Sequence, residues 1–175
     1  MMEEEEKEYR SRVQWAAASY LSMTPTTQIM LLACDENDAG GGTVRYRLGG
    51  IKVDPETSDD EAATTVSAGV RAALDELKQS KGGRIALPLT HPAVKALLPV
   101  AFSSSSSSGK DSSATTTTSD NENNDDADDP RSVRTVILQR INDGSCWMAS
   151  SDQLLAGYTS GDLKWLGKLA DYVRD

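Results

Sequence analysis

The feature that most constrains this chain is a low-complexity stretch in residues 103–130, which divides it into two unequal parts. The stretch opens with six serines, continues with a run of threonines at 115–118, and ends in asparagine and aspartate before Pro130. Such a composition cannot bury enough apolar surface to offset the entropy of ordering the chain. Only about 45 residues follow it, which is marginal for an independent core. We therefore expect one domain, formed by residues 9–102 and 131–175 together, with 103–130 as a disordered insertion.

Most of the formal charge of −9 lies in this insertion. Residues 103–130 hold seven acids against Lys110, a net charge of −6, which leaves −3 for the rest of the chain. Residues 1–8 contain five glutamates and are expected to form an acidic disordered tail, with the start of a helix as the alternative. Phosphate contacts need clustered lysine and arginine, so we expect no nucleic-acid partner and no binding to an anionic membrane.

Apolar runs, the amino-terminal residues and the cysteines indicate in which compartment of the cell the protein lies. No apolar run approaches the roughly 18 residues that span a bilayer, and the acidic start is unlike a secretory signal. We expect a soluble cytoplasmic protein, with the nucleus as the alternative. Cys34 and Cys146 each have apolar neighbours in the sequence. The favoured interpretation is two buried, reduced thiols, and the alternative is a disulfide or a reactive thiol.

Hydrophobic periodicity predicts an α+β fold with a single mixed sheet of about five strands and helices packed on it. Residues 9–23 fit a helix slightly better than a strand. Further helices are expected after a capping box at Ser58 and Glu61, at 93–98, and at 162–174 behind a box formed by Thr159 and Asp162. Strands are expected at 28–34, 43–48, 84–89, 133–141 and 146–149, with residues 51–53 as an extension and an Asp143-Gly144 hairpin turn.

One turn offers the chemistry of a ligand site. Asp35, Glu36 and Asp38 could bind Mg²⁺ or Ca²⁺ through carboxylates, and the glycines at 40–42 could cradle a phosphate with backbone amides. The turn fails the EF-hand pattern and joins two strands, so a solvated hairpin turn is the favoured interpretation. A lone histidine, His91, excludes histidine-rich zinc sites, and no serine stands in a G-x-S-x-G turn. No catalytic residue, metal site or cofactor is therefore expected.

The expected order of strands and helices, with an aspartate after the first long strand, resembles the ribonuclease H topology. In that resemblance Asp35 matches the first metal-binding carboxylate. It implies a small metal- or phosphate-binding enzyme domain that uses the turn from Asp35 to Asp38 and from Gly40 to Gly42. The family's further carboxylates would fall where this chain has Ala68, Gly69 and Thr90. A second resemblance, of residues 141–147 to the hairpin of profilin-like domains, covers mostly turn chemistry and carries no prediction.

Four residues could form a partner interface, Arg45, Arg47, Trp165 and Tyr172, although an ordinary exposed sheet face for the arginines and simple core packing for the aromatic residues are the favoured interpretations. The two arginines alternate with apolar residues and are expected together on the outer face of their strand, where they could receive an acidic partner. Trp165 and Tyr172 stand beside the apolar stripe of the last helix, and aromatic residues are enriched in interfaces. The sequence therefore predicts a non-catalytic protein-interaction module, an accessory or assembly subunit (scaffold or chaperone-like) of an intracellular complex. The metal- or phosphate-binding domain is the alternative.

Overall fold

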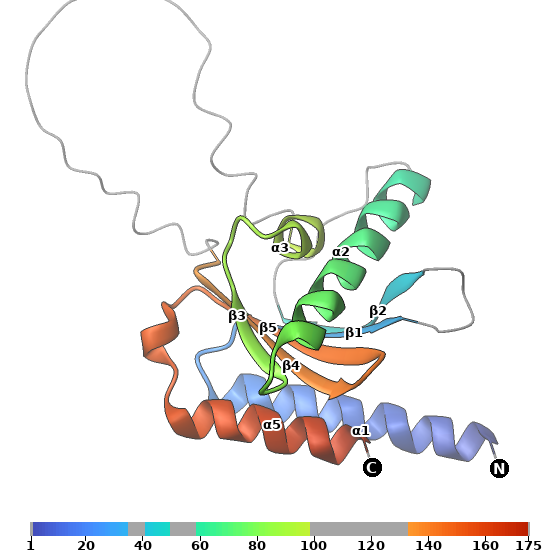
Figure 1. The fold of residues 1–175 in the computed structure, drawn as a ribbon. Helices are drawn as coiled ribbons and strands as arrows, with labels where there is room; N and C mark the ends of the chain where they lie inside the picture. The colour runs from blue at the N-terminus through green and yellow to red at the C-terminus, as the bar shows by residue number, and fades with distance from the viewer. Residues whose placement is uncertain (1, 35–40, 50–58, 99–132, 175) are drawn as a thin grey trace, which may run out of the picture.

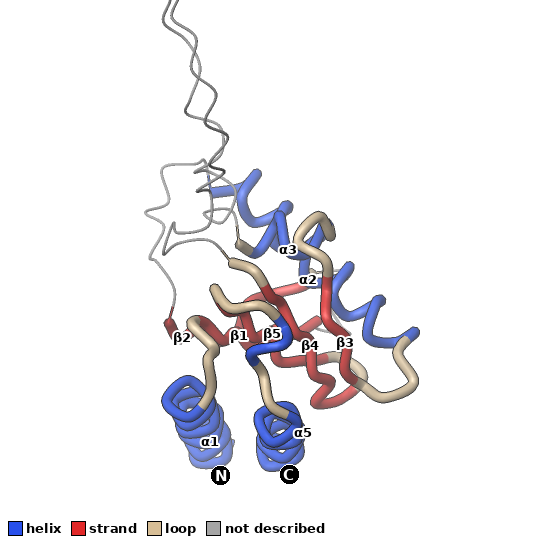
Figure 2. The backbone as a smooth tube through the Cα atoms, turned by 90° about the vertical axis from the view of Figure 1, so that its left-hand side faces the viewer, coloured by secondary structure: helices blue, strands red, loops and turns tan. Residues whose placement is uncertain are grey.

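The structure of the chain is a computed structural model, and it describes residues 2–34, 41–49, 59–98 and 133–174. Within these residues one sheet contains β1 (Gln28–Cys34), β2 (Gly42–Gly49), β3 (Arg84–Leu87), β4 (Thr135–Asn142) and β5 (Ser145–Ser151). Helices α1 (Met2–Met23) and α5 (Ser160–Arg174) cover one face of it, and α2 (Asp59–Gln79) and α3 (Pro92–Leu97) cover the other (Figures 1 and 2). A single 3₁₀ turn, η1 (Leu155–Gly157), precedes α5. The α+β class with one five-stranded sheet is confirmed.

The strands lie in the order β2-β1-β5-β4-β3, and every neighbouring pair is antiparallel. We expected a mixed sheet. The difference arises because the helical connection through α2 joins β2 to β3, which are the two edge strands and never neighbours. The hairpin of β4 and β5 fills the space between β1 and β3.

Strands from both sides of residues 103–130 pair with each other in this sheet. β5 pairs with β1, and β4 pairs with β3, so the last part of the chain completes a sheet that the first part begins. Residues 103–130 themselves lie outside the described residues, as do the predicted extension at 51–53 and Ser58 of the first capping box.

Each face of the sheet has its own core. From β1, Ile29 and Leu31 pack under α1 and α5, whereas Met30 and Leu32 pack under α2 and α3. This alternation explains why the strand is a continuous apolar run, since both of its faces are buried. Within the described residues Cys34 and Cys146 form no disulfide; Cys146 is buried and Cys34 half-buried.

Helix α1 begins earlier than expected. The predicted disordered tail is wrong, because the helix starts at Met2 and its first turns carry the glutamates. Acidic side chains are stabilised near a helix N-terminus by the partial positive charge of the unpaired amide groups there. The ambiguity over residues 9–23 is resolved in favour of helix, with Val13 and Tyr20 on the buried side.

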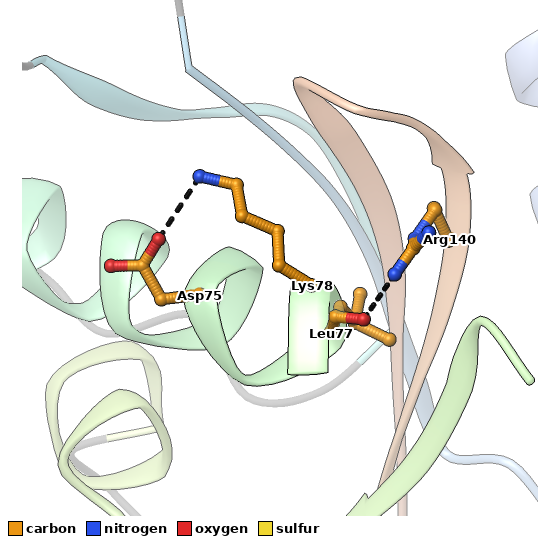
Figure 3. A network of polar contacts seen from close by, with 4 residues as sticks. All are labelled: Asp75, Leu77, Lys78 and Arg140. Atoms are coloured by element: carbon orange, nitrogen blue, oxygen red, sulfur yellow. Dashed lines mark hydrogen bonds and ion pairs between the residues drawn. The ribbon is translucent and has the colours of Figure 1, made fainter. Parts of the chain in front are cut away.

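Specific side chains complete the helix ends. The predicted capping box of α5 is present, with the Thr159 amide donating to Asp162 Oδ2 at 2.7 Å and the Asp162 amide donating to Thr159 Oγ1 at 3.1 Å. At the carboxyl end of α2, the guanidinium Nη2 of Arg140 on β4 donates to the carbonyl oxygen of Leu77 (Figure 3). A cation is favourable there because the last carbonyls of a helix carry partial negative charge.

Candidate functional site

The two predicted arginines lie on opposite faces of the sheet. The pairing of β1 with β2 shifts register, so that Tyr46 packs on the core under α1 and α5 while Val44 packs on the core under α2 and α3. Arg45 is the extra residue of this bulge, and the side chains change faces across it. The expectation that Arg45 and Arg47 share one outer face is therefore wrong.

Arg47 lies on the α2 side, opposite Met30 in the register. The Gln28 side chain is beside it, and with its amide oxygen turned toward the guanidinium it accepts hydrogen bonds from Nε and Nη2. Partial burial lowers the pKa of Arg47. The arginine thus contributes to the local structure of the sheet edge.

Arg45 borders a groove between the first half of α1 and the sheet. An open cavity of about 530 Å³ there is lined by Tyr9, Arg45, and residues at the ends of β1 and around the β4–β5 turn: Ala33, Cys34, Asn142, Asp143, Gly144 and Ser145. A second cavity of about 220 Å³ also touches Tyr9 and Arg45. Burial raises the pKa of Tyr9, and the nearby charges of Arg45 and Arg12 offset part of that effect.

The chemistry available to this groove is limited. Among the described residues no group of three His, Cys, Asp or Glu side chains could hold a metal ion. Residues 35–40, which carry the predicted carboxylates, lie outside the described residues, and the amide of Gly42 donates to Ser67 Oγ at 2.9 Å. His91 is far along the chain at the start of α3, where its Nδ1 accepts from the Ala93 amide at 3.2 Å. The histidine is therefore a helix cap.

A different surface gathers the aromatic residues. The ring of Tyr172 on α5 contacts the ring of Trp15 on α1 edge to face, with centroids 5.3 Å apart and planes at 63°. Two turns earlier on α5, Trp165 shares a cavity of about 250 Å³ with Met23, Thr24 and Asp162. We call Trp15, Met23, Trp165 and Tyr172 the aromatic face.

Three of the four side chains of the aromatic face are exposed. Trp15 is 52% exposed, Met23 58% and Tyr172 44%. Trp165 is half-buried, and its indole Nε1, which is shielded from solvent, has no hydrogen-bond partner among the described residues. Indole and phenol groups combine a large apolar area with a hydrogen-bonding edge, which suits them to contact with another molecule.

Of these four residues, the sequence pattern marks Trp165 and Tyr172, which border the apolar stripe of α5. It does not mark Trp15 and Met23 of α1. A signal was present, because Trp15 lies off the buried stripe of Val13 and Tyr20 that defines the inner side of α1. An aromatic side chain on the outer side of a helix does not reach the core that the inner side of the helix covers.

Charged residues flank the aromatic face. On α5, Lys164 and Lys168 are exposed, and neither has an ion-pair partner in the part of the chain that the structure describes. On α1, the exposed glutamates at positions 3 to 6 and 8 lie in the first two turns, and Glu6 pairs with Arg10 at 3.4 Å. The two sets have opposite sign.

None of the described helices is long and apolar enough to cross a membrane. Comparison with known proteins found no family model that matches the chain, no similar characterised protein and no similar solved structure.

Proposed function

We propose that this chain is a non-catalytic protein-interaction module, an accessory or assembly subunit of an intracellular complex, and that its partner binds the outer side of α1 and α5. The aromatic face is the observation that carries the proposal. Two of its rings and one thioether are about half exposed, although each is large and apolar.

The size of this surface supports the proposal. An aromatic side chain offers about 150–250 Å² of surface, so half-exposed Trp15, Tyr172 and Met23 together present on the order of 300 Å². Apolar patches of about 300–600 Å² on soluble proteins often mark binding sites. Tryptophan and tyrosine also dominate the residues whose truncation weakens interfaces most.

The test removes the aromatic face without touching the core. The double variant Trp15→Ser/Tyr172→Ser and the control Leu154→Ser, which replaces another exposed apolar residue, are each tagged in the native cell and purified beside the wild type. We expect a partner at fixed stoichiometry with the wild type and the control, and its loss with the double variant. A wild-type chain that purifies alone, or a partner that the double variant keeps, would contradict the proposal.

A further inference from the structure

We propose that the groove between the first half of α1 and the sheet binds a small aromatic monocarboxylate, with its ring in the smaller cavity and its carboxylate on Arg45. The site goes beyond the proposed function, because it lies on a different surface from the aromatic face. Three features carry the proposal: the apolar floor of the smaller cavity, a bulge that directs Arg45 into it, and the charges around the two cavities.

The smaller cavity is an apolar compartment. It has a volume of about 220 Å³ and is lined by Val13 of α1 and Leu31 of β1, which are 2% and 1% exposed, and by Tyr46 of β2. A dry apolar cavity of about 150 Å³ is sufficient for benzene. The compartment therefore has room for one aromatic ring with a short substituent.

The bulge in β2 brings a positive charge to this compartment. In a regular strand, consecutive side chains point to opposite faces of the sheet. Here the pairing with β1 skips Arg45 between Val44 and Tyr46, and as a result Arg45 and Tyr46 line the same cavity. Bulges are frequent next to active sites, where they redirect a side chain. In this chain the redirected side chain is a guanidinium beside an apolar compartment.

Tyr9 and Arg45 form the wall that the two cavities share. Burial keeps the pKa of Tyr9 raised despite the opposing charges of Arg45 and Arg12 nearby, so its phenol stays protonated at neutral pH and can donate a hydrogen bond. A carboxylate at this wall would meet a guanidinium and a phenolic donor together. Hydrogen bonds from a charged donor to a carboxylate are about twice as strong as those between neutral groups.

The surroundings of Arg45 favour a ligand with a single negative charge. The other arginine that lines the smaller cavity, Arg10, is paired with Glu6 at 3.4 Å, and Asp143 lines the larger cavity. A dianion such as a phosphate monoester would therefore meet a carboxylate in each cavity, and like charges repel. A monocarboxylate requires only the guanidinium and the phenol.

The larger cavity connects the site to solvent. Its volume of about 530 Å³ lies in the range of ligand pockets, and polar groups of the β4–β5 turn form part of its lining. The Asn142 Oδ1 accepts from the Gly144 amide at 3.0 Å and from Ser145 Oγ at 2.9 Å, which fixes the shape of this turn. The ligand can therefore enter through the larger cavity while its ring is held in the smaller one.

Nuclear magnetic resonance titration of the isotopically labelled full chain tests the site, with phenylacetate as the probe. Phenylacetamide has the same ring without the charge, acetate has the charge without the ring, and phenyl phosphate carries close to two negative charges above pH 7. The variant Arg45→Gln removes the guanidinium. The matched control is Arg71→Gln, which changes an exposed arginine of α2 on the other side of the sheet.

We expect phenylacetate to shift the amide signals of Tyr9, Leu31 and Tyr46 saturably, with a dissociation constant on the order of 0.1–1 mM for a ligand of this size. Phenylacetamide, acetate and phenyl phosphate should each bind at least about tenfold more weakly, because each lacks the ring or the single charge. Phenylacetate should bind Arg45→Gln at least about tenfold more weakly as well, and Arg71→Gln as it binds the wild type.

Several outcomes would overturn the proposal: no saturable shift up to about 10 mM phenylacetate, shifts confined to another part of the chain, equal binding of phenylacetamide, or full binding by Arg45→Gln. Tighter binding of phenyl phosphate would overturn the monocarboxylate as the ligand class. Circular dichroism verifies that Arg45→Gln is folded, and the comparison of the four probes on the wild type decides the proposal even if it is not. None of these outcomes bears on the aromatic face, whose own test is the loss of a partner.

Discussion

Arg140 should be the side chain outside the core that contributes most to stability, because it closes the carboxyl end of α2. Its guanidinium Nη2 donates to the Leu77 carbonyl (Figure 3). The same Nη2 lies 3.5 Å from the Ser80 carbonyl, and the Arg140 backbone amide donates to the Gly83 carbonyl at 2.7 Å. Without the guanidinium, half-buried helix carbonyls would lose a charged donor. The residue thus joins α2 to β4 across a long separation in the sequence.

The perturbation is Arg140→Met, which keeps much of the apolar stem. A hydrogen bond from a charged donor contributes about 1.5–3 kcal/mol, and a cation at a partly buried helix C-terminus up to about 2 kcal/mol. These contributions overlap at one group, so we expect the free energy of unfolding to fall by about 2 kcal/mol. With a urea dependence of about 2 kcal/mol per molar, the unfolding midpoint should fall by about 1 M.

Urea unfolding followed by circular dichroism measures this change, with Arg174→Met as the control. Arg174 pairs with Asp171 at 3.0 Å on the surface, where an ion pair contributes at most about 1 kcal/mol. The reasoning would be refuted by an Arg140→Met variant within about 0.5 kcal/mol of the wild type, or by equal losses for the two variants.

Three further predictions concern packing, ionisation and chain organisation. Gly69→Ala would place a Cβ 2.6 Å from the Ala96 Cβ, so thermal unfolding should show a loss of about 1–3 kcal/mol, whereas Gly82→Ala, with nothing within 4 Å, should change little. Burial raises the pKa of Tyr20 above 10.0, so its contribution to stability is complete below pH 10 and is lost as the pH rises further. The part of the tyrosinate absorbance that a Tyr20→Phe variant lacks should therefore appear together with unfolding, and its appearance in a folded protein near pH 10 would contradict this. Replacing residues 103–130 with a short Gly/Ser linker should leave the fold intact, with the helix and strand signals of the circular dichroism retained and a melting temperature no lower than that of the wild type, whereas the carboxyl-terminal part expressed alone should be unfolded.

The elements with a strong local signal could be predicted from the sequence. The continuous apolar run of β1 indicated a strand buried on both faces, and the spacing of Thr159 and Asp162 located the start of α5. In both cases the residues that determine the structure are neighbours in the chain. The order of the strands is harder to predict from the sequence, because it depends on where the β4–β5 hairpin enters the sheet.

The candidate site shows what local patterns leave out. Arg45 and Arg47 alternate regularly in the sequence, yet a bulge separates them onto two faces because β2 must follow the packing of β1. Likewise, Trp15 contacts Tyr172 only because α1 and α5 lie side by side, and the two residues are far apart in the sequence. The sequence predicts a tail for the glutamates of α1. Their charge alone does not show that the helix formed by the following residues extends back to Met2.

We propose that a partner covers the aromatic face in the cell, and hydroxyl-radical footprinting tests this most directly. The chain is oxidised in its native assembly and, separately, as the diluted monomer, and mass spectrometry compares the oxidation of each residue. We expect strong protection of Trp15, Met23 and Tyr172 in the assembly, with Leu154 oxidised equally in both. Equal oxidation of the three aromatic-face residues in assembly and monomer would contradict the account.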